Sequence, residues 1–330
     1  MKKEMYSSEV TLLRDTFRRL LRRHAKTNIV KLIDKTHPSD LALIFRYFNE
    51  TEQDSIFSSM LASEDTVKFL YELDESIATR LIENETPERL AGIMEQASSN
   101  EQVFLMGLVS DQFATSVIDL LQADEQEELE EMMAYPDDSA GILMYTDVFT
   151  LHEETKARQA IYALQDQEDA EMVFYLYTLD DDGRLTGVIS LRDLVTTPGE
   201  TMLKDIMSKN IQAVRPETDQ EEVARIVSQY NFLAVPVVDA DEKLLGIVTV
   251  DSVVDVIREE ATEDFLQLAG AGKDREILLK SSWENARIRL PWLFASWIGG
   301  IIAAFIIGIF NNILESAIAL AAFIPVIIGM

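Results

Sequence analysis

The chain of 330 residues contains no cysteine and only three histidines. Without cysteine, disulfide bonds, a thiolate zinc site and a cysteine nucleophile are excluded. The histidines (His24, His37 and His152) are scattered, and we find neither a Gly-rich phosphate loop nor a nucleophile–base pair, so the sequence does not indicate an enzyme. Basic residues are also few, with 29 Lys and Arg against 58 Asp and Glu. The net charge of -29 disfavours a general attraction to nucleic acid or to anionic lipid.

Two runs near the end of the chain lack charge and are mostly apolar. Residues 290–310 form 21 consecutive uncharged positions, enough for a helix to cross a hydrocarbon core of about 30 Å. Residues 316–330 form a shorter run that stops inside an apolar stretch, so we expect a fragment whose remaining membrane helices are absent. Five basic residues between positions 273 and 289 precede the first run, and only Glu315 follows it. This asymmetry predicts that the N-terminal region is cytoplasmic. The two apolar runs together predict a multi-pass protein of the cell (inner) membrane.

The acidic excess is concentrated between these ends, because residues 27–272 hold 51 acidic and 16 basic residues. Two interpretations stay open: a solvated acidic surface, which is the commoner case, or a surface whose repulsion is relieved by bound cations. The segment from Arg14 to Lys26 is basic instead. Contact with lipid headgroups, contact with the acidic part of the chain, and a solvated helix face are all consistent with it.

Residues 10–135 have apolar positions that recur at intervals of three and four, which is typical of helices packed on one face. Helix starts are predicted at Pro38, Thr51 and Thr86, where cap residues or proline precede first-turn acids. Repeated starts with short connections predict antiparallel helix pairs in a helical repeat.

Residues 137–257 change to short strands and helices, and the pattern occurs twice. Residues 174–195 align with residues 233–254 at a constant offset of 59. Each copy predicts an apolar strand, a turn, a second strand, and a helix capped by Ser190 or Thr249. Two such half-buried sheets are expected to pack on one another.

This repeat resembles the tandem cystathionine-β-synthase (CBS) domain pair. In that family, a Ser or Thr and an Asp three residues later face the phosphates and ribose of an adenine nucleotide. Ser190 and Asp193 match, with Arg192 beside them, whereas Ser252 stands at the Asp position of the second copy, so at most one complete nucleotide site is expected. Without a ligand, Ser190 is simply a helix cap and Asp193 a first-turn acid. Both interpretations stay open.

The helix that follows the repeat is acidic at helical spacing, where like charges destabilise each other. A divalent cation with oxygen ligands would reverse that interaction, and hydrated Mg²⁺ needs only one or two carboxylates. The alternative is a solvated acidic helix. The acids concerned are Asp251, Asp255, Glu259, Glu260, Glu263 and Asp264.

Taken in order, the helical domain, the CBS-like pair, the acidic segment Glu259–Asp264 and the segment Arg289–Trp292 resemble the MgtE family of magnesium channels and transporters. The resemblance covers essentially the whole chain and implies a multidomain membrane protein. Its expected parts are an all-α helical-repeat domain (1–135), an α/β tandem CBS pair (136–199 and 200–257), a connecting plug helix (258–285) and the truncated start of an α-helical transmembrane domain (286–330).

The resemblance also implies a function and its site residues. The protein would be a homodimer whose cytoplasmic part binds Mg²⁺ and closes the pore when internal Mg²⁺ is high. Departures from the family are Gly92, Asn231 and Ser252, which stand where acids are expected, and the pore acid of the family falls outside this chain. The implied Mg²⁺ ligands are Glu88, Glu221, Asp255, Glu260, Glu263 and Asp264, and the implied ATP-binding residues are Tyr175, Ser190, Arg192, Asp193 and Phe232.

Two other classes of function remain open. A membrane-anchored CBS module that senses adenine nucleotides is supported by Ser190 and Asp193. A scaffold whose helical repeats bind a protein partner is supported by architecture alone.

Overall fold

The computed structural model describes residues 2–61, 63, 65–166, 174–268 and 282–309, with the backbone alone for residues 2–9, 263, 265–268, 282–289 and 292. It divides into two compact units: unit 1, Met1–Arg258, and unit 2, Glu259–Met330. The predicted second apolar run (316–330) and most of the basic cluster before the first run lie outside the described residues, as do positions 269–281 of the predicted connecting helix.

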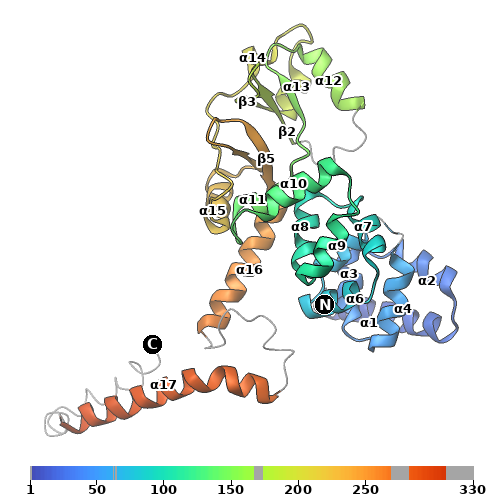
Figure 1. The fold of residues 1–330 in the computed structure, drawn as a ribbon, viewed down its shortest axis with the longest axis vertical. Coiled ribbons are helices and arrows are strands. Elements are labelled where there is room, and N and C mark those ends of the chain that lie inside the picture. The colour runs from blue at the N-terminus through green and yellow to red at the C-terminus, as the bar shows by residue number, and fades with distance from the viewer. Residues whose placement is uncertain (1, 62, 64, 167–173, 269–281, 310–330) are drawn as a thin grey trace. The chain divides into compact units, whose positions relative to one another are not determined.

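Unit 1 begins with ten helices among the described residues (Figure 1). The predicted all-α domain is therefore confirmed. The helices are α1 (Lys2–Arg22), α2 (Lys26–Ile33), α3 (Pro38–Phe45), α4 (Glu50–Met60), α5 (Thr66–Tyr71), α6 (Glu75–Glu83), α7 (Pro87–Met94), α8 (Ser99–Gly107), α9 (Asp111–Ile118) and α10 (Ala123–Met133).

Local capping explains where these helices start. Helix α3 begins at Pro38 and helix α7 follows Thr86, as predicted. The start predicted at Thr51 is wrong, because α4 begins earlier, after the cap residue Asn49. The Asn49 side chain accepts a hydrogen bond from the backbone N–H of Glu52 at 2.9 Å, and the Glu52 carboxylate accepts one from the backbone N–H of Asn49 at 3.2 Å. This reciprocal capping box satisfies two backbone donors, which Thr51 would not do.

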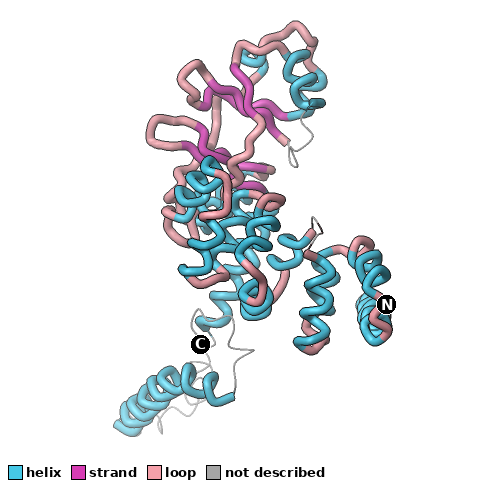
Figure 2. The backbone as a smooth tube through the Cα atoms, turned by 45° about the vertical axis from the view of Figure 1, so that its right-hand side comes forward, coloured by secondary structure: helices cyan, strands magenta, loops and turns pink. Residues whose placement is uncertain are grey.

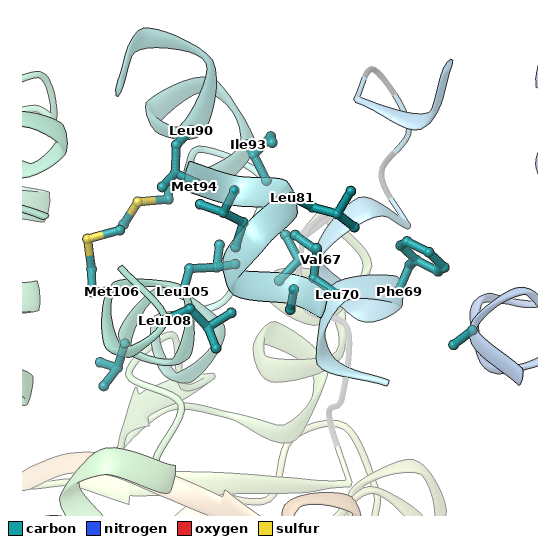
Figure 3. Packing of buried hydrophobic residues seen from close by; sticks show 14 of the residues in the cluster. Val67, Phe69, Leu70, Leu81, Leu90, Ile93, Met94, Leu105, Met106 and Leu108 are labelled. Carbon is teal, nitrogen blue, oxygen red and sulfur yellow. The ribbon is translucent and has the colours of Figure 1, made fainter. Parts of the chain in front are cut away.

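The core of the helical domain is continuous with that of the second CBS-like copy. Figure 3 shows buried side chains of α5, α6, α7 and α8 gathered in this core. The same cluster includes Val223, Val235 and Val248 from the second copy and Val253 and Val256 from the following helix. Because burial of apolar surface is the main favourable term in folding, the shared core explains why these parts form one unit.

The strand-and-helix repeat is confirmed. The first copy has a sheet in which β1 (Thr150–His152) pairs parallel to β2 (Tyr175–Leu179), and β2 pairs antiparallel to β3 (Leu185–Ser190). The second copy has the antiparallel pair β4 (Ala234–Val238) and β5 (Leu244–Thr249), and Figure 2 shows the strands of both copies in magenta. The helices of this region are α11 (Ala140–Leu143), α12 (Ala157–Asp166), α13 (Leu191–Thr196), α14 (Leu203–Ile206) and α15 (Gln220–Tyr230).

The two hairpins correspond in detail. The first has its register shift between Thr178 and Leu179, and the second has it 59 residues later, between Val237 and Val238. The copies also pack on one another as expected, because Tyr177 of β2 and Ile247 of β5 lie in one buried cluster.

Two further helices follow the repeat. Helix α16 (Val250–Leu268) runs through the predicted boundary at 257/258 without a break, and α17 (Ser282–Ile309) lies in unit 2. Within the part of the chain that the structure describes, no helix meets the combined length and apolarity of a membrane span. The large apolar side chains of α17 that are exposed are Leu290, Leu293, Phe294, Trp297, Ile298, Ile301, Ile302, Phe305, Ile306 and Ile309.

Replacing Gly246 in β5 by alanine is expected to destabilise unit 1 by about 1–3 kcal/mol, the usual range for overpacking. A Cβ atom there would lie 2.6 Å from the backbone oxygen of Tyr145. That oxygen is held in place, because it accepts a hydrogen bond from the Ile247 N–H at 2.9 Å. Chemical denaturation of residues 1–258 measures the effect.

The matched control is Gly92→Ala in α7, where a Cβ atom meets nothing within 4 Å. Because alanine is the better helix former, this variant is expected to gain about 0.5–1 kcal/mol. Equal stability of the Gly246→Ala variant and the parent would show that the Tyr145 backbone yields without cost.

Candidate functional site

The residues predicted to bind phosphate and ribose lie where β3 ends and α13 begins. The Ser190 hydroxyl oxygen accepts a hydrogen bond from the backbone N–H of Asp193 at 3.1 Å, so Ser190 is the N-cap of α13. The same hydroxyl donates to the Asp193 carboxylate at 2.7 Å. Asp193 and Arg192 are exposed. A capped helix start with an exposed carboxylate and guanidinium can accept from ribose hydroxyls and bind phosphate.

Tyr175 lies directly across the hairpin from Ser190, as its register partner in β2. Its half-buried ring is 6.5 Å from that of Tyr177 and packs against the buried cluster that contains Ala234 of the second copy. The structure therefore brings Tyr175, Ser190 and Asp193 together at the junction of the two copies.

Phe232, the fifth predicted residue, belongs to the second copy, in the connection between α15 and β4. Its half-buried ring stacks on that of Tyr230, with centroids 5.4 Å apart and planes 16° from parallel. Asn231 between them has a left-handed backbone with φ of 53° and ends α15. Sequence reasoning missed Tyr230, although two aromatic residues flanking an asparagine at a helix end could have indicated a stacked pair.

The equivalent position of the second copy is closed. Thr249 and Ser252 correspond to Ser190 and Asp193, but they are only 1% and 7% exposed. Their hydroxyl oxygens lie 3.4 Å apart. This position offers neither a carboxylate nor an accessible hydroxyl, whereas the first copy has a half-buried Ser190 and an exposed Asp193.

Tyr177, between the two copies, was not singled out from the sequence. Its hydroxyl is buried and has no hydrogen-bond partner among the described residues. Burial raises the pKa of Tyr177, and the nearby Tyr175 adds to the effect. The phenol therefore stays protonated and neutral in the core.

The predicted Mg²⁺ ligands of unit 1 lie on three different helices. Glu88 is exposed in the first turn of α7, and hydrogen bonding from its own backbone N–H, then from the Thr86 hydroxyl, lowers its pKa. Glu221 is exposed in the first turn of α15. Asp255 on α16 is half-buried and lies 3.6 Å from the guanidinium of Arg258. All three offer carboxylate oxygens, the donor type that Mg²⁺ prefers.

The remaining predicted ligands belong to the part of α16 in unit 2. Glu260 and Asp264 are four residues apart, so they share a helix face, and the side chain of Glu263 lies outside the described residues. Nowhere in the described part of the chain do three or more Asp, Glu, His or Cys side chains converge into a metal-binding group. The donors present suit a hydrated Mg²⁺ ion bound through one or two carboxylates rather than a cage of protein ligands.

An acidic surface that sequence reasoning passed over lies between α10 and the second copy. A pocket of about 350 Å³ is lined by acids of α10 together with Met144, Thr146 and Leu245. The Thr146 hydroxyl contacts both Glu128 and Ser99, which joins the helical domain to the start of the CBS-like pair. The available signal was composition, since six of the eight residues from 124 to 131 are acidic. The acids lining the pocket are Asp124, Glu127, Glu128 and Glu131.

Models of known protein families match most of unit 1. A family model described as the MgtE intracellular N domain matches residues 36–138, and the CBS domain model matches residues 140–199 and 203–259. Among solved structures, the soluble part of a magnesium transporter is 28% identical with a TM-score of 0.68, and the match covers 76% of this chain and 99% of that one. The cytosolic domain of the Mg²⁺ channel MgtE in complex with ATP is 30% identical with a TM-score of 0.70, covering 74% and 99%.

Three curated relatives share the name magnesium transporter MgtE. The magnesium transporter MgtE of Enterococcus faecalis is 39% identical over 208 residues, which is 63% of this chain and 46% of the relative. That of Bacillus subtilis is 31% identical over 300 residues, which is 91% of this chain and 66% of the relative. The chain therefore spans about half to two thirds of the length of these relatives.

Proposed function

The chain belongs to the MgtE family, and we propose that it carries the Mg²⁺-sensing gate of a magnesium transporter. The observation that carries the proposal is the charge of unit 1, which contains 50 acidic and 24 basic residues. Within this unit, the helical domain and the second CBS copy share one core. So large an excess of one sign destabilises the compact state by self-repulsion. A divalent cation relieves that repulsion more effectively than a monovalent one.

In the proposed mechanism, cytoplasmic Mg²⁺ binds to acids of unit 1 and α16 and holds the domains closed. Helix α16 continues from unit 1 into unit 2, so a change in unit 1 acts on the segment that follows. The result is closure of the pore when internal Mg²⁺ is high. The ligands in this proposal are Glu88, Glu221, Asp255, Glu260, Glu263 and Asp264.

Several weak sites explain such a switch better than one tight site. Moving a two-state equilibrium from 1:99 to 99:1 requires about 5.5 kcal/mol of differential binding. The predicted ligands are spread over α7, α15 and α16, and the acidic pocket of α10 adds a further surface between the helical domain and the CBS pair. Binding at several sites that favour the same closed state is cooperative, so a steep response to Mg²⁺ follows.

Membrane location and dimer formation are parts of the same proposal. The exposed apolar side chains of α17 support insertion of residues 290–310 into the cell membrane, where membrane lipid surrounds them. On unit 1, the exposed apolar residues at the end of α15 and on α16 support a homodimer contact. These residues are Tyr230, Leu233, Val254 and Ile257.

Small-angle scattering of residues 1–272 during a titration with MgCl₂ at constant ionic strength tests the proposal. We expect a cooperative decrease in the radius of gyration at millimolar Mg²⁺ that NaCl of the same ionic strength does not reproduce. An unchanged radius of gyration would contradict the proposal and would favour the interpretation of the acidic excess as a solvated surface.

A second candidate function is adenine-nucleotide sensing by the CBS pair. The junction of Tyr175, Ser190 and Asp193 supports it, and one similar structure is an MgtE cytosolic domain in complex with ATP. In this proposal, ATP or AMP binds at the first copy alone, because the second copy has buried Thr249 and Ser252. A nucleotide-dependent change in the same scattering experiment, in the absence of any Mg²⁺ response, would favour this function.

A further inference from the structure

The first two helices carry a charge opposite to that of the rest of unit 1. Residues 10–35 contain eight basic and two acidic residues, in a chain whose net charge is -29. They belong to α1, to α2 and to the turns that follow these two helices, and α1 packs on α2 (Figure 1). The positive charge is therefore gathered on one pair of neighbouring helices.

Two of these basic residues interact with other residues of the helical domain. Arg14 pairs with Asp15 at 2.9 Å and lies over the ring of Tyr47 at 5.9 Å. Arg18 donates a hydrogen bond to the backbone oxygen of Tyr47 at 2.6 Å. The other six are exposed and have no ion pair or hydrogen bond from their side chains among the described residues. We call them the basic stripe: Arg19, Arg22, Arg23, Lys26, Lys31 and Lys35.

Exposed aliphatic side chains accompany the basic stripe. Leu12 is 65% exposed and precedes Arg19 by seven residues, so both lie on one face of α1. Val30, next to Lys31 on α2, is 39% exposed. The surface therefore combines guanidinium and ammonium groups with aliphatic side chains that are exposed among the described residues of unit 1.

This combination points to an anionic phospholipid surface. An acidic protein face or a nucleic acid would satisfy the cations but would leave Leu12 and Val30 against polar groups. A phospholipid surface offers phosphates for bidentate arginine contacts, with acyl carbons directly beneath them. We propose that the basic stripe, together with Leu12 and Val30, docks unit 1 onto a membrane surface that contains anionic lipid.

The docking goes beyond the proposed Mg²⁺ gate and can be tested separately from it. All the buried clusters of unit 1 lie between residues 17 and 256, and a similar protein was crystallised as a soluble part, so residues 1–258 can be used alone. Sedimentation with phosphatidylcholine vesicles that contain phosphatidylglycerol, without added Mg²⁺, measures binding. We expect binding at low ionic strength, loss of binding as NaCl is raised, and none to pure phosphatidylcholine.

Matched variants identify the surface. Arg22→Glu with Arg23→Glu is expected to lower binding by about tenfold or more, because two cations near the surface become anions. The control, Lys209→Glu with Lys243→Glu, makes the same charge change at two exposed lysines outside the stripe and should bind like the parent. Leu12→Ser should weaken binding without altering charge.

Absence of vesicle binding by the parent overturns the proposal, as does an equal loss in both double variants. Self-association that the Arg22→Glu, Arg23→Glu variant alone abolishes, with no binding to vesicles, would overturn it in favour of contact with the acidic surface of a second copy. None of these outcomes depends on whether Mg²⁺ contracts the protein.

Discussion

Replacing Asp193 by alanine is expected to lower the affinity for AMP and ATP by about tenfold to a hundredfold, the range for losing hydrogen bonds to a charged group. The Asp193 carboxylate is exposed and can accept from two ribose hydroxyls. The Asp193 carboxylate also accepts a hydrogen bond from the Ser190 hydroxyl at 2.7 Å. The substitution therefore removes a hydrogen-bond partner of the hydroxyl that is predicted to face phosphate. Isothermal titration calorimetry on residues 1–258 measures the affinity.

The control for this prediction is Asp205→Ala. Asp205 is also an exposed acid in the first turn of a helix, α14. Its replacement by alanine therefore removes the same negative charge from the same position relative to a helix start. We expect nucleotide affinity to be unchanged and the melting temperatures of both variants to be close to that of the parent. If Asp193→Ala binds AMP as tightly as the control does, the nucleotide site is not at the start of α13.

Replacing Asp255, Glu260 and Glu263 together by alanine is expected to leave residues 1–272 compact in the absence of Mg²⁺. Neutralising three acids on one helix removes repulsion that Mg²⁺ otherwise relieves. The radius of gyration of the variant without Mg²⁺ should approach that of the parent with Mg²⁺, and most of the Mg²⁺-dependent contraction should be lost. Small-angle scattering under the conditions of the parent titration measures both quantities.

The matched control removes the same charge from elsewhere in unit 1. Glu75, Glu83 and Asp119 are exposed acids of the helical domain that are not among the proposed ligands. Their triple alanine variant should contract with Mg²⁺ much as the parent does. Unchanged Mg²⁺ sensitivity in the α16 variant, or an equal loss of Mg²⁺-dependent contraction in both variants, would contradict the assignment of α16 as the sensing helix. Either result would indicate a general screening effect.

Local features of the fold were accessible from the sequence because their causes act over a few residues. The helix starts at Pro38 and after Thr86 depend on a cap residue or proline and on the first turn. The start at Thr51 was misplaced because Asn49 offered a better reciprocal cap with Glu52. The paired hairpins follow from alternation and turn residues, so even the equivalent register shifts agree with the offset of 59.

The candidate nucleotide site was equally local in its first part. Ser190 and Asp193 are three residues apart at one helix start, so the sequence predicted Ser190 as the helix cap and Asp193 as an acid of the first turn. The position of Tyr175 opposite Ser190 also follows once the hairpin is known. The stacking of Tyr230 on Phe232 was not predicted, because it depends on the left-handed backbone of Asn231 at the end of α15.

The sequence by itself determined the helical domain, the doubled strand-and-helix repeat, the acidic excess and the basic start of the chain, since capping, periodicity and charge are properties of short segments. Only the tertiary structure decided that the helical domain shares a core with the second copy, that the acids of α10 line a pocket beside Met144 and Leu245, and that Thr249 and Ser252 are buried. These features depend on which surfaces fit together across many residues. Burial of apolar area stabilises any well-packed contact between such surfaces. Short-range sequence patterns do not specify which of the possible contacts forms.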